Sequence, residues 1–464
     1  MFSRSALSRG ARLSTRRQCC SQLAQRRGFA AAASSAPAAL TYDTNKVAGV
    51  NVATRDSHGP TTRLAVVAKA GTRYSGYPGL TVGLEEFAFK NTAKRSALRI
   101  VREAELLGGQ LVAYHTREAL VLEASFLRED LPYFTELLAE VVSETKYTSS
   151  EFHEDVERVI HEKQAKLAND VSALALDEVH SVAFHTGLGT PLYPSPSTPL
   201  KQYLNEHFIV NYADNAYYKG NIALVADGAA TPALHKWTEQ FFQSVPESPS
   251  KNALAGMWLS KATKYYGGEQ RTAHKAGNSI AIAFPGSSFG TFKPEIAVLA
   301  ALLGGQPNVK WSPGFSLLSK AAASNPGVVA SATNFAYSDA GLLTIQITGA
   351  SASVSKAAEE AVKALKGISE KAVSKEDLTK AIAKAKFDAL DASQSGVSTL
   401  LATGSGILHG GKPFEIAGTV QSIDAVTADK LTATAKSLLA GKASVAAVGD
   451  LFKLPYAADL GLTV

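Results

Sequence analysis

Cysteine is almost absent from this sequence of 464 residues. The only two cysteines are Cys19 and Cys20, and both lie near the start of the chain. If that region is removed as a leader, the remaining protein has no thiol, which excludes disulfide bonds, cysteine-ligated iron–sulfur clusters, cysteine zinc sites and thiol catalysis. We therefore expect the protein to carry no cysteine-ligated centre, and we predict no other cofactor either.

Acidic residues are also missing from the start of the chain, where the first one is Asp43. The first 27 residues hold seven arginines and are rich in serine and alanine. This composition, without a continuous apolar core, is typical of a mitochondrial presequence and not of a secretory signal. The segment RGFA at 27–30 resembles a matrix processing site, so we predict a presequence over residues 1–29 and a flexible lead-in over 30–41. A disordered tail that is never removed is the alternative.

Long apolar runs and a basic surface are missing as well. No stretch reaches the roughly 18 uninterrupted apolar residues that a membrane-spanning helix needs. The formal charge of +6 belongs to the leader, because the rest of the chain holds 40 basic against 41 acidic residues. The sequence therefore argues against nucleic-acid binding, and any contact with a membrane would have to run through partners or the protein surface.

The strand pattern predicts two similar domains, since the chain is too long for one compact core. Three predicted strands of the first half recur in the same order in the second half, with a nearly constant offset. The repeat indicates a duplicated α+β fold in which each domain is a mixed or antiparallel sheet flanked by helices; chance similarity of element order is the alternative. We place the domains at 42–246 and 263–464, with a linker at 247–262. The strands are residues 65–71, 119–126 and 222–226, which recur as 280–286, 342–348 and 444–448.

Local patterns place the elements around the most informative motif. Apolar spacing predicts helices at 81–90, 130–146 and 150–167. The stretch 186–199 holds four prolines and two glycines, and it should form a loop.

The segment Ala70–Thr92, AGTRYSGYPGLTVGLEEFAFKNT, resembles the metal-site segment of the pitrilysin-type zinc peptidases. This family includes the mitochondrial processing peptidase and the core subunits of ubiquinol–cytochrome c reductase. Its members carry an inverted His-x-x-Glu-His motif on a helix. Both imidazoles bind one zinc ion, the glutamate between them acts as general base on the metal-bound water, and a glutamate far downstream completes the ligand set.

The resemblance places non-ligating or poorly suited residues at this site. Val82 occupies the first histidine position and Glu86 the second, Glu85 keeps the position of the general base, and the downstream ligand falls on Glu162. Valine has no donor atom, and carboxylates alone suit harder cations than zinc. We therefore expect no catalytic residue and no metal. The three glutamates should be solvated in a cleft; if they are buried together, one should titrate high or pair with a lysine or arginine.

A finer resemblance separates two branches of the family. The non-catalytic, alpha-type subunit of the processing peptidase has a long glycine-rich loop, whereas Leu303–Gly314, LGGQPNVKWSPG, holds only three glycines. Together with Phe335–Leu343, FAYSDAGLL, it is similar to the core 2 branch of the reductase subunits.

This resemblance implies a structural and assembly subunit of respiratory complex III, without a redox centre, on the matrix side of the mitochondrial inner membrane. Its partners would be core protein 1, cytochrome b, cytochrome c1 and the iron–sulfur subunit. Two alternatives stay open: an alpha-type subunit of the processing peptidase, and a free peptide-binding protein that uses the empty cleft.

Other motifs are interpreted as ordinary structure. The stretch 286–290, GSSFG, fits the sequence pattern of a nucleophile elbow. Such an elbow must lead directly into a helix, but here the segment Thr291–Pro294 intervenes, so we interpret the stretch as an ordinary turn. His153, Glu157 and His161 can share a helix face, which we interpret as solvated. Pro413 after Gly410-Gly411-Lys412 rules out a phosphate-binding loop.

Overall fold

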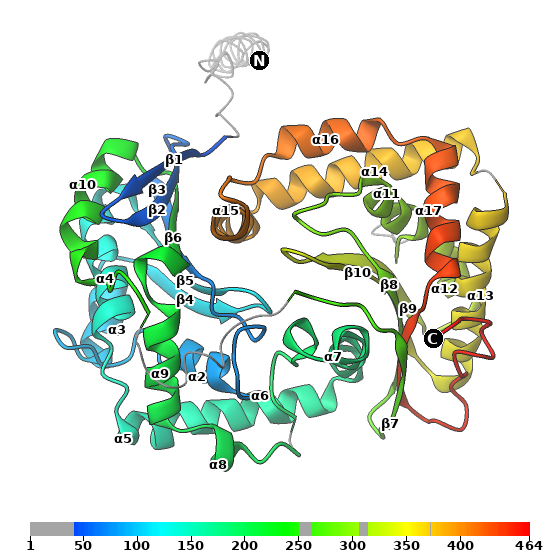
Figure 1. Cartoon of the computed structure of the whole chain (residues 1–464), viewed down its shortest axis with the longest axis horizontal. Helices are drawn as coiled ribbons and strands as arrows, with labels where there is room; N and C mark the ends of the chain where they lie inside the picture. Colours follow the sequence, from blue (N-terminus) through cyan, green and yellow to red (C-terminus); the bar gives the residue numbers. More distant parts are fainter. Residues whose placement is uncertain (1–40, 196, 250–261, 306–313, 372) are drawn as a thin grey trace, which may run out of the picture. The chain divides into compact units, whose positions relative to one another are not determined.

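The computed structural model describes residues 41–195, 197–249, 262–305, 314–371 and 373–464 (Figure 1). The predicted presequence at 1–29, nearly all of the lead-in at 30–41 and most of the linker at 247–262 lie outside these residues. The domain boundaries stay a prediction.

Two sheets organise the described part of the chain. The first has the strand order β1-β2-β6-β3-β5-β4, and the second has the order β7-β11-β8-β10-β9. In each sheet one neighbouring pair is parallel, β2 with β6 and β7 with β11, and the other pairs are antiparallel. The strands are β1 Asp43–Val47, β2 Val50–Arg55, β3 Thr61–Ala68, β4 Gln110–His115, β5 Leu120–Leu127, β6 Ile222–Asp227, β7 Gly268–Ala273, β8 Asn278–Pro285, β9 Val329–Ala336, β10 Gly341–Gly349 and β11 Ser444–Gly449.

The duplication predicted from the sequence is confirmed by this topology. Five strands of the first sheet match the five of the second in order and direction, and β1 is an addition at the edge. The three predicted repeats lie on β3 and β8, on β5 and β10, and on β6 and β11. The fold is therefore α+β, with two mixed sheets flanked by helices.

The helices follow the same repeat, and several begin at capping side chains. Ser96, Thr148, Ser374 and Thr427 each accept a hydrogen bond from a backbone N–H of the helix that follows. In the first half the helices are α2 Leu80–Glu86, α3 Ala97–Leu106, α4 Leu131–Glu144, α5 Ser149–Glu151, α6 Glu157–Asn169, α7 Val171–Phe184, α8 Leu200–Tyr203, α9 Glu206–Ala216 and α10 Thr231–Phe241. In the second half they are α11 Pro294–Leu303, α12 Leu317–Ser324, α13 Ser351–Glu370, α14 Lys375–Gln394, α15 Gly396–Gly410, α16 Ile416–Asp424 and α17 Ala428–Ala440.

Two predicted helices differ in detail from the structure. The helix expected at 81–90 ends at Glu86, and Phe89 then adopts a positive φ of 61°, which a continuing right-handed helix cannot contain. The helix expected at 150–167 contains a π-helical turn at Phe152–Val156 between α5 and α6. Apolar periodicity does not reveal such an inserted residue.

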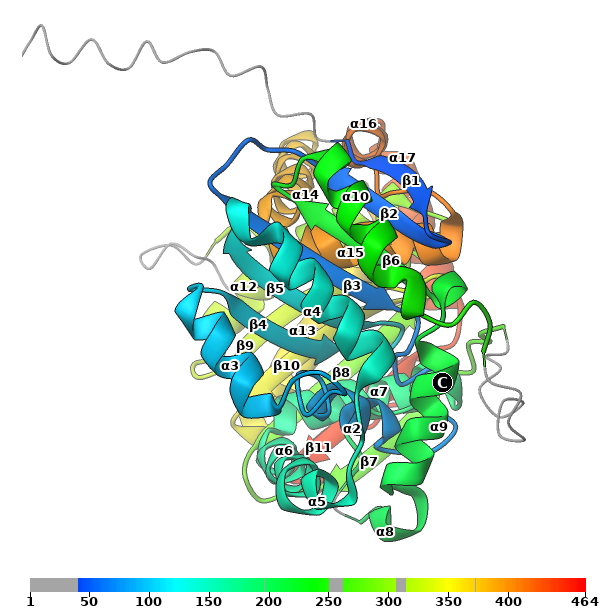
Figure 2. The same ribbon diagram turned by 90° about the vertical axis from the view of Figure 1, so that its left-hand side faces the viewer.

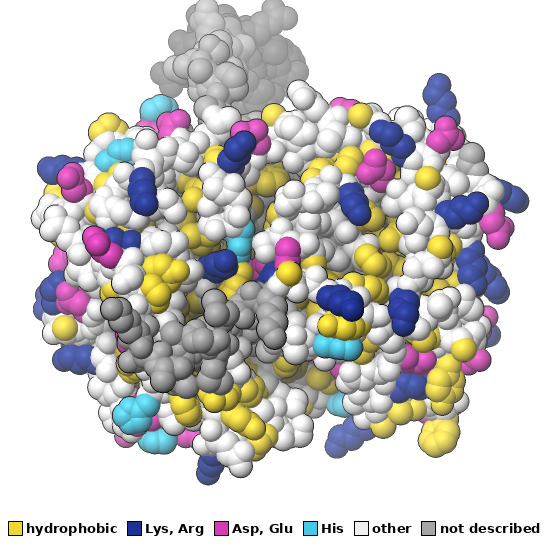
Figure 3. Space-filling view, viewed as in Figure 1, with side chains coloured by type: hydrophobic (Ala, Val, Ile, Leu, Met, Phe, Trp, Pro, Cys, Tyr) yellow, Lys and Arg dark blue, Asp and Glu magenta, His cyan; other side chains and the backbone are white. Residues whose placement is uncertain are grey.

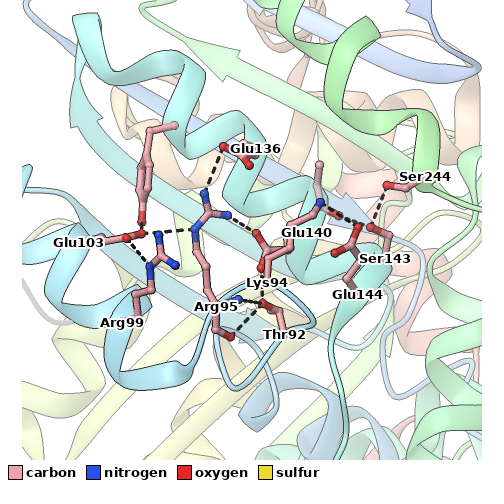
Figure 4. A network of polar contacts seen from close by, with 12 residues as sticks. Thr92, Lys94, Arg95, Arg99, Glu103, Glu136, Glu140, Ser143, Glu144 and Ser244 are labelled. Carbon is pink, nitrogen blue, oxygen red and sulfur yellow. Dashed lines mark hydrogen bonds and ion pairs between the residues drawn. The ribbon is translucent and has the colours of Figure 1, made fainter.

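The outer face of the first sheet is covered by α4 and α10 (Figure 2). Phe134, Leu137 and Leu138 of α4 are fully buried in the same apolar cluster as Leu64 of β3 and Leu122 of β5. Next to this contact, Arg95 binds the carboxylates of three glutamates and fixes the start of α3 to α4 (Figure 4). These glutamates are Glu103, Glu136 and Glu140.

The inner face of each sheet is covered by a helix from the other half of the chain (Figure 1). Helix α7 of the first half packs on the second sheet, where Ala175 and Val179 join a buried cluster with Ala281 and Val448. Helix α15 of the second half packs on the first sheet. Gly404 makes that approach possible, since a Cβ there would lie 2.5 Å from the Val67 side chain. Each half therefore completes the core of the other.

The surface is consistent with a balanced charge. Lys and Arg alternate with Asp and Glu over the face in Figure 3, without a large area of one sign. None of the helices that the structure describes is both long and apolar enough to cross a membrane.

Candidate functional site

Helix α2 carries the positions that resemble the zinc motif, and its surroundings hold it in place. Gly71, after β3, lies against the turn between β4 and β5, and a Cβ there would come within 2.3 Å of the Arg117 carbonyl oxygen. Gly83 lies similarly close to Ile209 of α9. Residues Leu80–Glu85 are buried, so this helix faces protein atoms on most sides.

Val82 fills the first histidine position with a methyl-bearing side chain. It is 1% exposed and belongs to the apolar cluster of the first half. The residue therefore contributes packing where the family has a metal ligand.

Glu85 is buried between two nitrogen groups. One carboxylate oxygen accepts a hydrogen bond from Lys163 Nζ at 2.6 Å, and the other is in short contact with Nδ1 of His115. The side chain of Glu85 is 7% exposed. Burial alone would raise the pKa of Glu85, but the hydrogen bonds with His115 and Lys163 outweigh it, so the pKa lies below its ordinary value.

Lys163 joins both carboxylates of α2. Its ammonium group also contacts Glu86, and it lies 5.6 Å from the centre of the Tyr193 ring. Burial alone would lower the pKa of Lys163, but hydrogen bonds to Glu85 and Glu86 raise it above the ordinary value, so the group is cationic at neutral pH.

Glu162 does not join this group. It is exposed on α6, while the next residue, Lys163, is the one that contacts Glu85 and Glu86. Successive helical residues point about 100° apart, so both cannot face α2. The expectation that the acids are solvated is wrong for Glu85, which is buried; the other outcome, pairing with a lysine, is the one observed.

The proline-rich loop at 186–199 packs against His115 and Lys163 and covers the site. In its described part, the loop holds one short 3-10 turn, Gly187–Gly189. Nε2 of His115 lies 3.0 Å from the Leu192 carbonyl oxygen, and Gln164 of α6 donates to that of Pro194. The T-shaped contact between Tyr193 and His115 adds to this closure.

Arg117 anchors the beginning of the same loop. Its guanidinium donates to the carbonyl oxygens of Leu188 and Thr190 and pairs with Asp177 of α7. Burial raises the pKa of Asp177 and Arg117 opposes this effect. The loop is thereby tied to a strand turn and to the helix that covers the second sheet.

A second polar cluster joins the hairpin turns of the two halves. Arg73, from the Ala-Gly-Thr-Arg segment, donates two hydrogen bonds of 2.7 Å to Asp339 and one of 2.6 Å to Glu118. The backbone N–H of Ser338 donates to Glu118. Burial alone would raise the pKa of Asp339, but hydrogen bonds from Arg73 and Thr263 lower it to about 2.

A buried histidine lies close to this cluster. Nδ1 of His180 lies 2.6 Å from the Leu176 carbonyl oxygen, and Nε2 lies 2.9 Å from the Tyr337 hydroxyl. Nδ1 must carry the proton because a carbonyl can only accept, so Nε2 accepts from Tyr337. Burial holds the pKa of His180 well below its ordinary value, and the imidazole is neutral.

The residues of the degenerate motif do not fit a zinc ion. Among the described residues, no three His, Cys, Asp or Glu side chains are grouped so that they could hold a metal. Val82 offers no donor, and the two carboxylates that could contribute are engaged by Lys163 and His115. Activation of a water by zinc therefore has no structural basis here.

The remaining sequence motifs are ordinary structure. In the stretch 286–290, the Ser288 hydroxyl accepts from the Thr291 N–H, and α11 begins only at Pro294. The side chains of His153 and His161 are 62% and 58% exposed and flank Glu157. They line a surface cavity of about 770 Å³. Gly410 ends α15, and α16 begins only at Ile416, so the Gly410-Gly411-Lys412 segment does not lead directly into a helix as a phosphate-binding loop does.

Sequence reasoning missed the roles of His115 and Lys163, and it predicted the loop at 186–199 without its contacts to these two residues. His115 belongs to a strand that lies far from the motif in the sequence. Lys163 is adjacent to the aligned position 162, and only the rotation of α6 shows which of the two side chains faces α2.

Two family descriptions match the chain. Residues 51–195 match Insulinase (Peptidase family M16), and residues 205–385 match Peptidase M16 inactive domain. The chain is 64% identical to the mitochondrial cytochrome b-c1 complex subunit 2 of Neurospora crassa over 464 residues, which cover all of both chains. It is 37% identical to the subunit 2 of Yarrowia lipolytica over 92% of this chain and 98% of that one, and 28% identical to that of Mus musculus over 89% and 90%.

Proposed function

Because the chain belongs to the M16 peptidase family, in its cytochrome b-c1 complex subunit 2 branch, we propose that it works as a core subunit of mitochondrial complex III. It is a non-catalytic peptidase homologue and supports electron transport as part of this complex. The names of its relatives favour this function over that of a processing-peptidase subunit.

One observation carries the non-catalytic part of this function. The ammonium group of Lys163 lies where the carboxylates of Glu85 and Glu86 converge, and Val82 replaces the first imidazole. A zinc peptidase needs an open coordination position for water, and this site has a lysine in its place.

The finer placement is also part of the proposal. The chain lies on the matrix side of the inner membrane, next to core protein 1, cytochrome b, cytochrome c1 and the iron–sulfur subunit. The two halves exchange α7 and α15 and so pack against each other through both sheets, an arrangement that suits a permanent interface. The presequence ends at residue 29, and the mature chain begins near Ala30.

Native electrophoresis of mildly solubilised mitochondrial membranes, followed by mass spectrometry, tests this function. We expect the chain to migrate with cytochrome b, cytochrome c1 and the iron–sulfur subunit, with an N-terminal peptide beginning near Ala30. Recovery in a soluble heterodimer with a chain that has an intact His-x-x-Glu-His motif would overturn the proposal and identify a processing-peptidase subunit.

A further inference from the structure

We propose that Lys163 performs the structural role that a metal ion would have at this site. Its ammonium group holds α2, α6 and the loop at 188–195 together and prevents metal cations from binding. A catalytic metal in this position would also draw two helices together through its ligands. The inference concerns the fold of the chain and holds whichever complex the chain joins.

The first support is the convergence of three chain segments on one cation. Lys163 extends from α6, its Nζ lies 2.6 Å from Glu85 and in contact with Glu86 on α2, and the Tyr193 ring of the loop lies 5.6 Å away. An ammonium group has three donors and no acceptor, so it can satisfy two carboxylates at once. The same two carboxylates would otherwise repel each other.

The second support is that both carboxylate oxygens of Glu85 are already in contact with a nitrogen group. Oε1 accepts from Lys163, and Oε2 is in contact with Nδ1 of His115. The other ring nitrogen of His115 must donate to the Leu192 carbonyl, because a carbonyl only accepts. An incoming metal ion would have to displace the ammonium group from between Glu85 and Glu86, which makes metal binding unfavourable.

The third support is how the loop is held. His115 and Lys163 both contact the loop, through Leu192 and Tyr193. Gln164, next to Lys163 on α6, binds the Pro194 carbonyl. Loss of the ammonium group would therefore loosen α2 and the loop together, and neither depends on a bound metal.

Thermal unfolding of the mature full-length chain tests whether Lys163 holds α2, α6 and the loop together. We expect Lys163→Met to lower Tm by more than about 3 °C, because it leaves two carboxylates close together without their cation. Lys166→Met is the matched control, since Lys166 is an exposed lysine of the same helix, and it should change Tm by less than about 1 °C. Equal effects of the two substitutions would overturn the proposal.

Metal addition and removal test whether the ammonium group stands in for a cation. We expect EDTA and Mn²⁺ to leave the Tm of the unmodified chain unchanged. We expect Mn²⁺ to raise the Tm of Lys163→Ala, because the carboxylates of Glu85 and Glu86, which converge on Nζ of Lys163, would then lack a cation, and Mn²⁺ accepts carboxylate ligands. If Mn²⁺ leaves the Tm of Lys163→Ala unchanged, Lys163 does not perform the role of a metal ion.

A measurement on the unmodified chain keeps the proposal testable if the lysine variants do not fold. Calorimetric titration with Zn²⁺ should show the same binding for the unmodified chain and for Glu86→Gln. One Zn²⁺ bound tightly by the unmodified chain and lost in Glu86→Gln would overturn the proposal.

Discussion

The helix pair α2 and α6 in the first half corresponds to α11 and α14 in the second, but the two pairs are held together by different forces. Helix α2 turns Glu85 and Glu86 toward Lys163 of α6. Helix α11 is apolar along nearly its whole length and is buried in one cluster with Ala381 and Ala385 of α14. The same position in a duplicated fold therefore accepts either a buried ion pair or an apolar contact.

This difference shows which features of the first half the fold requires and which remain from the family's metal site. An apolar contact is sufficient to join these helices, as the second half shows. The ion pair in the first half requires the desolvation of two carboxylates and an ammonium group, and its geometry must be complete to offset that cost. Polar residues at α2 are thus a property of the degenerate site and are not needed for the topology.

The largest effect should come from breaking the apolar pair. Leu299→Ala removes a fully buried side chain of α11, and we expect it to lower the free energy of unfolding by about 2–5 kcal/mol, since it leaves a cavity. Urea denaturation followed by circular dichroism measures this loss. Val329→Ala, at an exposed position, is the control, and a similar loss there would show that α11 has no special importance.

The ion pair can be converted into the kind of contact found in the second half. Glu85→Leu alone should cost about 1–3 kcal/mol, because His115 and Lys163 lose a buried carboxylate. Glu85→Leu combined with Lys163→Met should cost less than the sum of the single changes, which a double-mutant cycle in urea would measure. Simple additivity would mean that the two residues do not act as a pair.

The comparison extends to the hairpin turns, where each half contributes charged groups to the other. Asp339→Asn removes the charge that Arg73 binds while Glu118 remains, so we expect a loss of about 1–2 kcal/mol in the free energy of unfolding. Chemical denaturation checks this value. Asp450→Asn, which changes a carboxylate that lies 3.5 Å from the exposed ammonium group of Lys453, should have a smaller effect, and an equal effect would remove the special role of the hairpin contact.

The smallest effect concerns pH. The pKa of His180 lies well below 6.5 in the folded chain because the ring is buried, whereas in the unfolded chain it is about 6.5. The unfolded state therefore binds the extra proton first, and stability falls as the pH drops below about 6.5, by at most about 1.4 kcal/mol per pH unit for one group. Urea unfolding at pH 7.5, 6.5 and 5.5 should show a weaker pH dependence for His180→Gln than for the unmodified chain. Equal slopes would mean that another group dominates.

Much of the fold could be predicted because strand periodicity survives in both halves. The strands at 65–71 and 280–286 are short apolar runs that end in glycine, and such runs identify buried strands without knowledge of their neighbours. The exchange of α7 and α15 could not be predicted. An amphipathic pattern shows that a helix has a buried face, but it does not say which sheet covers that face.

The loss of the metal ligands could be predicted from the sequence, but the contacts that replace them could not. Val82 cannot bind a metal in any conformation, so the sequence alone excludes the first ligand. The partnership of Glu85 with Lys163 and His115 depends on the rotation of α6 and on a strand that is distant in sequence. Such contacts are set by tertiary packing, which no local pattern encodes.

The exchange of helices also constrains the order in which the chain can complete its core during synthesis. All strands of the first sheet have been made when the ribosome reaches Asp227, but α15, which covers the inner face, is finished only at Gly410. Between these two points Ala65, Val121 and Val225 remain open to water and to other unfolded chains. The apolar inner face of the first half is therefore completed only after a long further stretch of chain, and a chain truncated before α15 should aggregate.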